Sequence, residues 1–165
     1  MKTLVMSFVL LRLDYCNGLL YGVTNMVQRK AQMVQNAAVR LVSGAGRFDH
    51  ITPHTHGAPL AEHRITFKIG VMAYLCVNGT APAYFRNVCV KTSTISTRSH
   101  LRSAGSGVVM VPKSRTVLGD RRFEVAGPVV WNGLTLDLRI ISSYPVFQKK
   151  LKLSCSSKRS PLRIN

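Results

Sequence analysis

Acidic residues are scarce in this sequence. Its 165 residues include six Asp and Glu against 23 Lys and Arg, which gives a formal net charge of +17. The six carboxylates are scattered along the chain, so we expect no carboxylate pair of the kind that holds catalytic metal ions. Asp120 and Glu124 are expected instead to pair with Arg121 and Arg122 or to cap a helix. The uncompensated positive charge favours a polyanionic partner, with nucleic acid the first candidate and an acidic membrane surface the second.

Cysteine is also sparse, and the sequence shows no close pairing among Cys16, Cys76, Cys89 and Cys155. Their separations of 60, 13 and 66 residues match neither a zinc knuckle nor a Cys-x-x-Cys redox motif. We therefore expect reduced thiols in a nuclear or cytoplasmic protein rather than in a secreted one.

Long hydrophobic runs are absent as well. The apolar stretch from Leu4 to Leu11 is too short to span a bilayer. It resembles the core of a secretory leader, but no small-residue cleavage site follows it, and Arg12 and Asp14 end it. We expect an amphipathic or buried helix here and no membrane partner. The alternative is a cleaved leader, which would make the chain a secreted basic peptide.

Motifs of the common enzyme classes are missing too. Neither a GxSxG nucleophile elbow nor a glycine-rich phosphate loop occurs. Four histidines, a residue type that binds zinc, lie within fourteen residues: His50, His54, His56 and His63. No thiolate ligand or HExxH motif accompanies them, so we expect solvated loop histidines. The sequence thus predicts no catalytic residue, no metal, no cofactor and no small-molecule substrate.

Apolar residues at three- and four-residue steps predict helices in the first half. One covers residues 2–21, and a second runs from an N-cap at Asn25 to a stop at Gly44. The apolar face of the second comprises Val27, Ala31, Val34, Ala38, Leu41 and Val42. A third helix is expected over residues 60–77, with an apolar face comprising Ile65, Ile69, Met72 and Leu75, broadened by Phe67, Val71 and Tyr74.

The second half is more basic and less periodic. Residues 83–165 carry a net charge of +12 and residues 1–82 carry +5, so we expect the anion-facing surface mainly in the second half. Residues 91–107 are Ser/Thr-rich and without periodicity, which predicts a loop or mobile linker. "GVVMVPKSR" is a candidate strand, and "PVFQKKLKL" predicts a short basic helix with Pro145 in its first turn. We expect Trp131 to anchor the core rather than to stack on a base.

Lysine and arginine neutralise phosphates with little preference for sequence. The candidates for phosphate contacts are basic residues of the second half, namely Arg98, Arg102, Lys113, Arg115, Arg121, Arg122, Lys149, Lys150 and Lys152. Arg29, Lys30 and Arg40 of the second predicted helix are secondary candidates.

Eight short motifs occur in one order along the chain: "KTLVMSFVLLRLDYCNGLLYG", "QRKAQMVQNAAVRLVSG", "FDHITP", "RITFKI", "NGTAPAYF", "VPKSR", "GDRRFEVAGPVVWNGL" and "FQKKLK". In this order, from about Lys2 to Leu153, they resemble the region that follows the catalytic palm in reverse transcriptases of LINE-type (non-LTR, jockey-like) retrotransposons. The chain departs from the family after "DHITP", where "HTHGAPLAEHR" replaces a Leu-His-Trp-Leu-Pro run.

The resemblance implies a mainly α fold: a small helical thumb-like bundle followed by a loop-rich basic C-terminal segment with one or two short strands. It places a thumb-like region at residues 1–90, the linker at 91–107, a basic C-terminal region at 108–153 and a flexible tail at 154–165. The family's catalytic aspartates and endonuclease domain have no counterpart in this sequence. The expected function is therefore non-enzymatic contact with RNA or DNA backbones at low sequence specificity. The alternative is an inert or partner-dependent fragment, whose apolar faces lack their usual neighbours.

Overall fold

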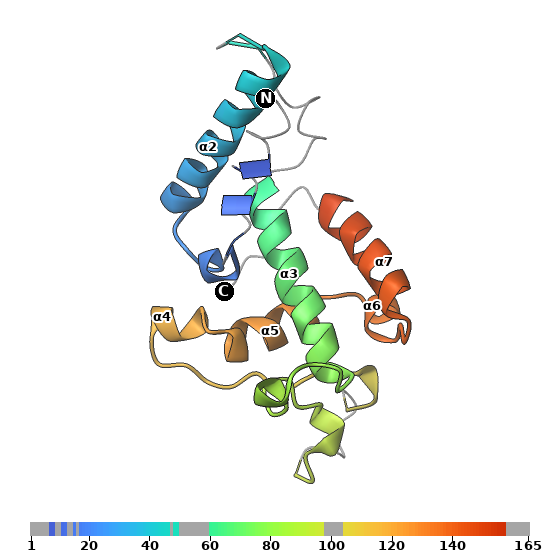
Figure 1. Ribbon diagram of the computed structural model, residues 1–165. Coiled ribbons are helices and arrows are strands. Elements are labelled where there is room, and N and C mark those ends of the chain that lie inside the picture. Colours follow the sequence, from blue (N-terminus) through green and yellow to red (C-terminus); the bar gives the residue numbers. More distant parts are fainter. Residues whose placement is uncertain are drawn as a thin grey trace. The chain divides into compact units, whose positions relative to one another are not determined.

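The computed structural model describes residues 7–8, 11–12, 15, 17–46, 48–49, 60–97 and 104–157, and this part is mainly α-helical, as predicted (Figure 1). Its longer elements are α2 Asn25–Ser43, α3 Leu60–Val77, α5 Phe123–Asn132 and α7 Tyr144–Ser157. Short α-helices are α4 Val117–Asp120 and α6 Leu136–Arg139. The 3-10 turns are η1 Asn17–Leu20, η2 Ala83–Phe85, η3 Thr92–Thr94 and η4 Ala104–Ser106.

The chain divides into two compact units, Met1–Ile65 and Thr66–Asn165, which are described separately below. The division falls inside α3. The boundary that the sequence suggested at residue 90 lies within the second unit, and so does the suggested linker at 91–107.

In the first unit, α2 ends where the sequence predicted. Gly44 adopts a left-handed conformation with φ of 72°, and its N–H donates to the carbonyl oxygen of Arg40 at 2.9 Å. The left-handed backbone conformation is sterically unfavourable for residues that have a Cβ, so glycine suits this position. The start differs from the prediction. Asn25 is the first helical residue rather than the N-cap, and Thr24, which precedes it, makes no side-chain capping hydrogen bond.

The predicted apolar face of α2 is only partly buried. Ala38 is buried, together with Gln35 and Val39, whereas Val27, Val34 and Leu41 are exposed. The buried side of α2 is therefore rotated away from the centre of its apolar face. The predicted face exists in the sequence, but three of its six residues are exposed and Ala38 alone among them is buried.

The bounds of α3 coincide with the predicted residues 60–77. Its buried positions follow a four-residue step from Ile65 through Ile69 to Ala73, with Tyr74 beside them. Met72, which the sequence placed on the buried face, is 36% exposed instead. After the last turn, Gly79 takes a φ of 71° and the chain turns back.

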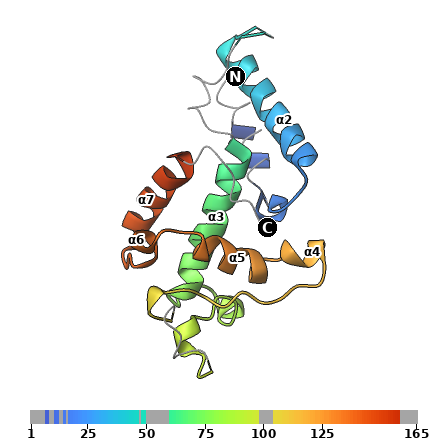
Figure 2. The same ribbon diagram turned by 180° about the vertical axis from the view of Figure 1, so that it is seen from behind.

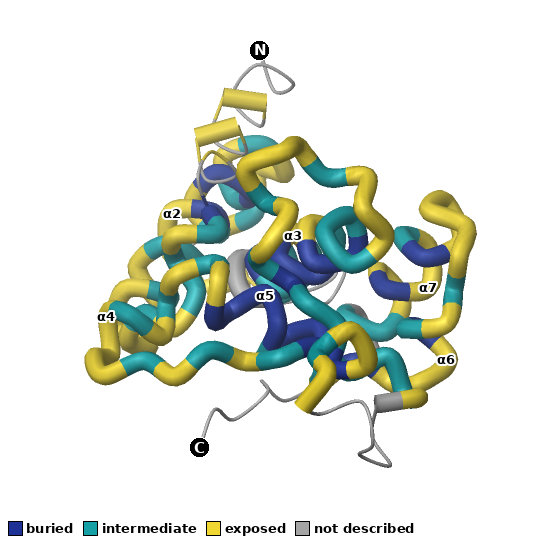
Figure 3. Tube along the Cα trace, turned by 90° about the horizontal axis from the view of Figure 1, so that it is seen from below, coloured by how far each residue is buried: buried dark blue, intermediate teal, exposed yellow. Residues whose placement is uncertain are grey.

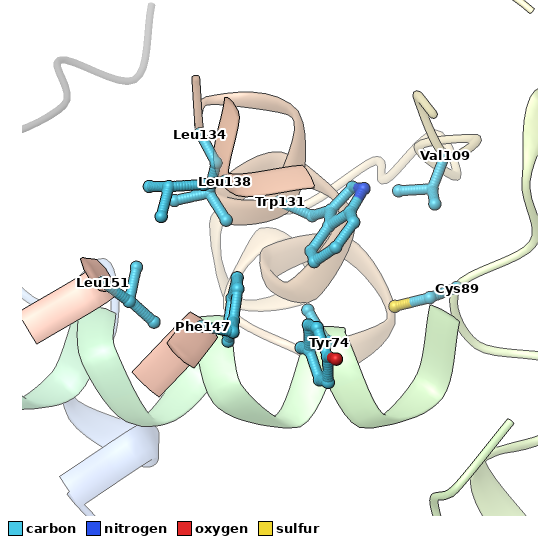
Figure 4. Close-up of a cluster of buried hydrophobic side chains, with 9 residues drawn as sticks. Tyr74, Cys89, Val109, Trp131, Leu134, Leu138, Phe147 and Leu151 are labelled. Carbon is cyan, nitrogen blue, oxygen red and sulfur yellow. The ribbon is translucent and has the colours of Figure 1, made fainter. Parts of the chain in front are cut away.

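The core of the second unit forms where α3, α5, α6 and α7 meet (Figure 4). Trp131 is 1% exposed, which confirms its expected role as a core anchor, and Phe147 and Leu151 of α7 are completely buried. The Tyr74 and Phe147 rings stack with centroids 4.2 Å apart, and the Tyr74 hydroxyl donates to the Ser142 carbonyl at 2.6 Å. Figure 3 shows the buried residues concentrated along α5 and the middle of α3.

Gly70 permits the close approach of α7 to α3. A Cβ on Gly70 would lie 3.1 Å from Cδ2 of Leu151 and 3.8 Å from Cγ1 of Val130. Figures 1 and 2 show α7 alongside α3, while α5 crosses it. Pro145 lies in the first turn of α7, as predicted, because that position needs no N–H donor for the helix.

The predicted strand does not form among the described residues. Val109 makes a single antiparallel bridge with Lys91. The backbone groups of Val109 bond to a side chain rather than to a second strand: its N–H donates to Asn132 Oδ1 at 3.0 Å, and its carbonyl accepts from Asn132 Nδ2 at 2.9 Å. The side chain of Asn132, at the end of α5, thus bonds the backbone groups of Val109, while Val108 and Met110 on either side of it bond to the backbone of Thr92 and Val90.

The ends of residues 91–107, described up to residue 97 and again from residue 104, are tied to the core. The Thr92 N–H donates to the Val108 carbonyl at 2.9 Å, and the Trp131 Nε1–H donates to the Gly107 carbonyl at 2.9 Å. Arg139 Nη1 donates to the Ser106 carbonyl at 3.0 Å. At the other end of the unit, α7 continues through residues 154–157, which the sequence assigned to the tail.

Candidate nucleic-acid interface

The described candidates for phosphate contacts fall into two groups on different elements. One group lies on and around α4, with Lys113, Arg115 and Arg122 exposed and Arg121 half-buried. The other group lies on α7. In Figures 1 and 2 α4 and α7 are on opposite sides of α3, so the two groups do not form one continuous patch. Arg98 and Arg102 lie outside the described residues.

The basic surface of α7 follows from its amphipathic sequence. Phe147 and Leu151, four residues apart, bury one side of the helix against the core. Lys149, Lys150 and Lys152 are exposed on the remaining surface. The helix sequence YPVFQKKLKLSCSS contains no acidic residue, so no carboxylate on α7 itself offsets these charges. The helix therefore presents three ammonium groups on a firmly held backbone.

The group around α4 is less strongly cationic. Arg122 Nη1 lies 3.5 Å from Glu124 Oε2, with both side chains more than half exposed, which confirms the predicted pairing of Glu124 with a neighbouring arginine. Arg122 Nε also donates to the Gly119 carbonyl at 3.2 Å. The short α4 helix is capped by Thr116, whose Oγ1 accepts from the Gly119 N–H at 3.0 Å. An exposed ion pair of this kind adds little stability, but it partly neutralises one of the four cations.

The secondary candidates lie on α2 in the first unit. Arg29 and Lys30 are exposed. Arg40 is half-buried, and its Nε is buried without a hydrogen-bond partner among the described residues. Arg29 and Lys30 are thus better placed than Arg40 to meet a ligand from solvent.

The histidine cluster falls mostly outside the described residues, which include His63 but not His50, His54 or His56. His63 is half-buried, and its Nδ1 is buried with no described partner. Within the described ranges, no three His, Cys, Asp or Glu side chains gather as metal ligands would. None of the helices in those ranges combines the length and apolar character required to cross a membrane.

A pair of thiols is the feature that the sequence interpretation missed. Cys89 belongs to the buried core cluster of the second unit and Cys76 packs against that cluster, although 13 residues separate them in the sequence. Their separation carries no motif, and the chain reverses between them, after α3. The glycine at position 79 was the one available signal of that reversal.

Comparisons with known proteins identify no relative of this chain. No protein-family model, no curated protein and no solved structure matches the chain.

Proposed function

We propose that this chain binds RNA or DNA through its phosphate backbone, as a non-catalytic remnant of a LINE-type reverse transcriptase. The ordered motifs of the sequence support the origin, and the charge of +17 supports the partner. The observation that carries the binding proposal is the outer surface of α7. There, three lysines within four residues are exposed on a helix whose other side is anchored in the core by Phe147 and Leu151.

Lysines in this arrangement act by displacing counterions from phosphates. Each phosphate contact contributes about 0.7 to the slope of log affinity against log salt on single strands and about 0.9 on duplex DNA. The group of Lys113, Arg115, Arg121 and Arg122 lies on the other side of α3, so one short strand would contact one group or the other. We expect α7 to contribute more, because Arg122 is already paired with Glu124.

The test is fluorescence anisotropy with a labelled single-stranded RNA of mixed sequence, titrated at several salt concentrations. Replacing Lys149, Lys150 and Lys152 together by Gln should lower the salt slope by roughly 2 and weaken binding. The matched control replaces the same residues by Arg, which keeps the charge and should keep the slope. A second variant, with Lys113 and Arg115 replaced by Gln, should have a smaller effect. Binding that does not weaken as salt rises would contradict the proposal.

The alternative, a partner-dependent fragment, is favoured by one observation on α2. Several large apolar side chains are exposed along one side of this helix: Met26 66%, Met33 68%, Val34 53% and Leu41 69%. They recur at steps of seven and eight residues, so they form an apolar stripe along the helix. A helix side that faces solvent normally carries polar side chains, so this stripe indicates a surface for a partner.

Binding of a hydrophobic dye in native buffer tests this alternative. We expect dye fluorescence that falls when Met33 and Leu41 are both replaced by Gln, while the circular dichroism signal is unchanged. Replacing Arg29 by Gln on the same helix is the control and should leave dye binding as it was. Dye binding that is equally strong in the double variant would place the exposed apolar surface elsewhere.

A further inference from the structure

The exposed side of α2 carries a narrow line of residues along most of the helix. This line, the α2 seam, comprises Met26, Lys30, Met33, Ala37 and Leu41, all exposed, at successive separations of four, three, four and four residues. Residues at such steps lie on one side of a helix, and a narrow seam of this spacing is the pattern along which two helices pack. From Met26 to Leu41 the seam extends roughly 22 Å.

The side chains of the seam suit a helix as the occupant. Ala37 is small and lies between the larger Met33 and Leu41, so a side chain of a docked helix can approach closely there. On one flank, the exposed Val27 and Val34 widen the apolar contact. Amphipathic helices bind to apolar surfaces through anchors at these three- and four-residue steps.

The charges beside the seam define what such a helix must carry. Arg29 and Arg40 are eleven residues apart, about three turns, so they lie on the same flank, opposite the flank of Val27 and Val34. Arg29 is exposed, and Arg40 Nε has no hydrogen-bond partner among the described residues. No residue of α2 is acidic. A helix with carboxylates along this flank therefore complements the charge of α2.

Lys30 lies within the seam, between Met26 and Met33. A partner that covers the seam takes this ammonium out of water, which is costly unless a carboxylate pairs with it. A second copy of α2 contains no carboxylate and would bring its own cations to the contact. An RNA backbone offers phosphates for the cations but no apolar side for Met33.

We propose that the α2 seam binds an acidic amphipathic helix of a partner protein, with apolar residues along its centre and carboxylates opposite Lys30, Arg29 and Arg40. This inference names the partner in the partner-dependent alternative, on which it rests, and it is independent of the phosphate contacts. The apolar residues supply affinity, and the charges select the partner and its orientation.

Two synthetic helices test the proposal on the full chain. Each is a fluorescein-labelled peptide of roughly 18 residues, long enough to match the seam, with leucine at three- and four-residue steps. One peptide carries Glu on both sides of the leucines, and the other carries Lys at the same places. Fluorescence anisotropy should show binding of the Glu peptide and no binding of the Lys peptide. Equal binding of both peptides, or binding of neither, would overturn the proposal.

A charge reversal locates the contact. Lys30→Glu should weaken binding of the Glu peptide by roughly tenfold or more and should allow the Lys peptide to bind. The matched control is Arg86→Glu on the second unit, because Arg86 is also exposed and the change in net charge is the same. That control should leave both affinities as they were. An effect of Lys30→Glu no larger than that of Arg86→Glu would place the peptide elsewhere and overturn the proposal.

An apolar variant keeps the test independent of charge. Replacing Met33 and Leu41 together by Gln should abolish binding of the Glu peptide, while the circular dichroism signal stays the same because both side chains are exposed. Unchanged binding in this variant would show that the peptide is held by charge alone, against the proposal.

The same variants identify the other occupants. If Lys30→Glu but not Arg86→Glu lost labelled RNA, and the Glu peptide did not bind, the seam would belong to nucleic acid. Loss of pelleting with vesicles of phosphatidylserine and phosphatidylcholine would assign the seam to a lipid surface in the same way. Each result would overturn the proposal. The salt slope of the α7 variant tests the phosphate contacts separately, so the two proposals can fail independently.

Discussion

The helices α2 and α7 have similar composition but opposite burial. Both are basic, and neither contains an acidic residue. In α7 the apolar residues Phe147 and Leu151 are fully buried and the lysines face outward. In α2 the side chains of Met33 and Leu41 are more than two-thirds exposed. Apolar periodicity therefore determines that a helix has an apolar side, whereas coverage of that side depends on a neighbouring element of fitting shape.

The largest expected effect compares one large apolar residue from each helix. Phe147→Ala removes a ring that stacks on Tyr74 and should lower the free energy of unfolding by about 3–5 kcal/mol. Leu41→Ala on α2 should change it by less than about 0.5 kcal/mol, because that side chain is 69% exposed. Denaturant titration followed by circular dichroism measures both. Equal losses would mean that the Leu41 side chain is covered in solution.

The prediction of intermediate size tests whether Gly70 is needed for the close packing of α7 against α3. Gly70→Val places a branched side chain where even a Cβ would be 3.1 Å from Leu151, and it should cost about 1–3 kcal/mol. Ala37→Val on the exposed side of α2 is the matched control, and it should cost only the difference in helix propensity, about 0.5 kcal/mol. Thermal melts of the two variants give the comparison. A Gly70→Val chain as stable as the wild type would show that α7 does not approach α3 at this point.

The smallest effect concerns how α2 ends. Gly44→Ala places a Cβ on a residue with φ of 72° and should cost about 1 kcal/mol. Gly133→Ala at the end of α5 should change stability by less than about 0.5 kcal/mol, because Gly133 has a φ of −75°, which alanine also adopts. Urea midpoints of the two variants measure the difference. If Gly44→Ala were neutral, the left-handed end of α2 would not persist in solution.

Several elements could be predicted from the sequence because their signals are local. Residues 60–77 and the stop at Gly44 were predicted from apolar spacing and a glycine, and both agree with the structure. The N-cap was misplaced by one residue, because Thr24 and Asn25 are both acceptable capping types. The strand at residues 107–115 was wrong, because pairing with residues 90–92 is limited to the single bridge between Val109 and Lys91, and the backbone groups of Val109 bond to the Asn132 side chain rather than to a further strand.

The candidate site was predictable only in part. Composition and charge indicated which residues could meet phosphates, and Lys149, Lys150 and Lys152 are indeed exposed on α7. Their separation from the basic residues around α4 could not be predicted from the sequence. This separation depends on the path of the chain past α3 (Figure 1).

By itself, the sequence determined the helical class of the described residues, the ends of α3, the basic character and the burial of Trp131. These follow from side-chain period, net charge and residue size, which act over a few neighbouring residues. The tertiary structure alone decided which part of the α2 apolar face is covered and which cations share a surface. Each of these depends on contacts between residues far apart in the chain, and such contacts exist only after the segments have packed.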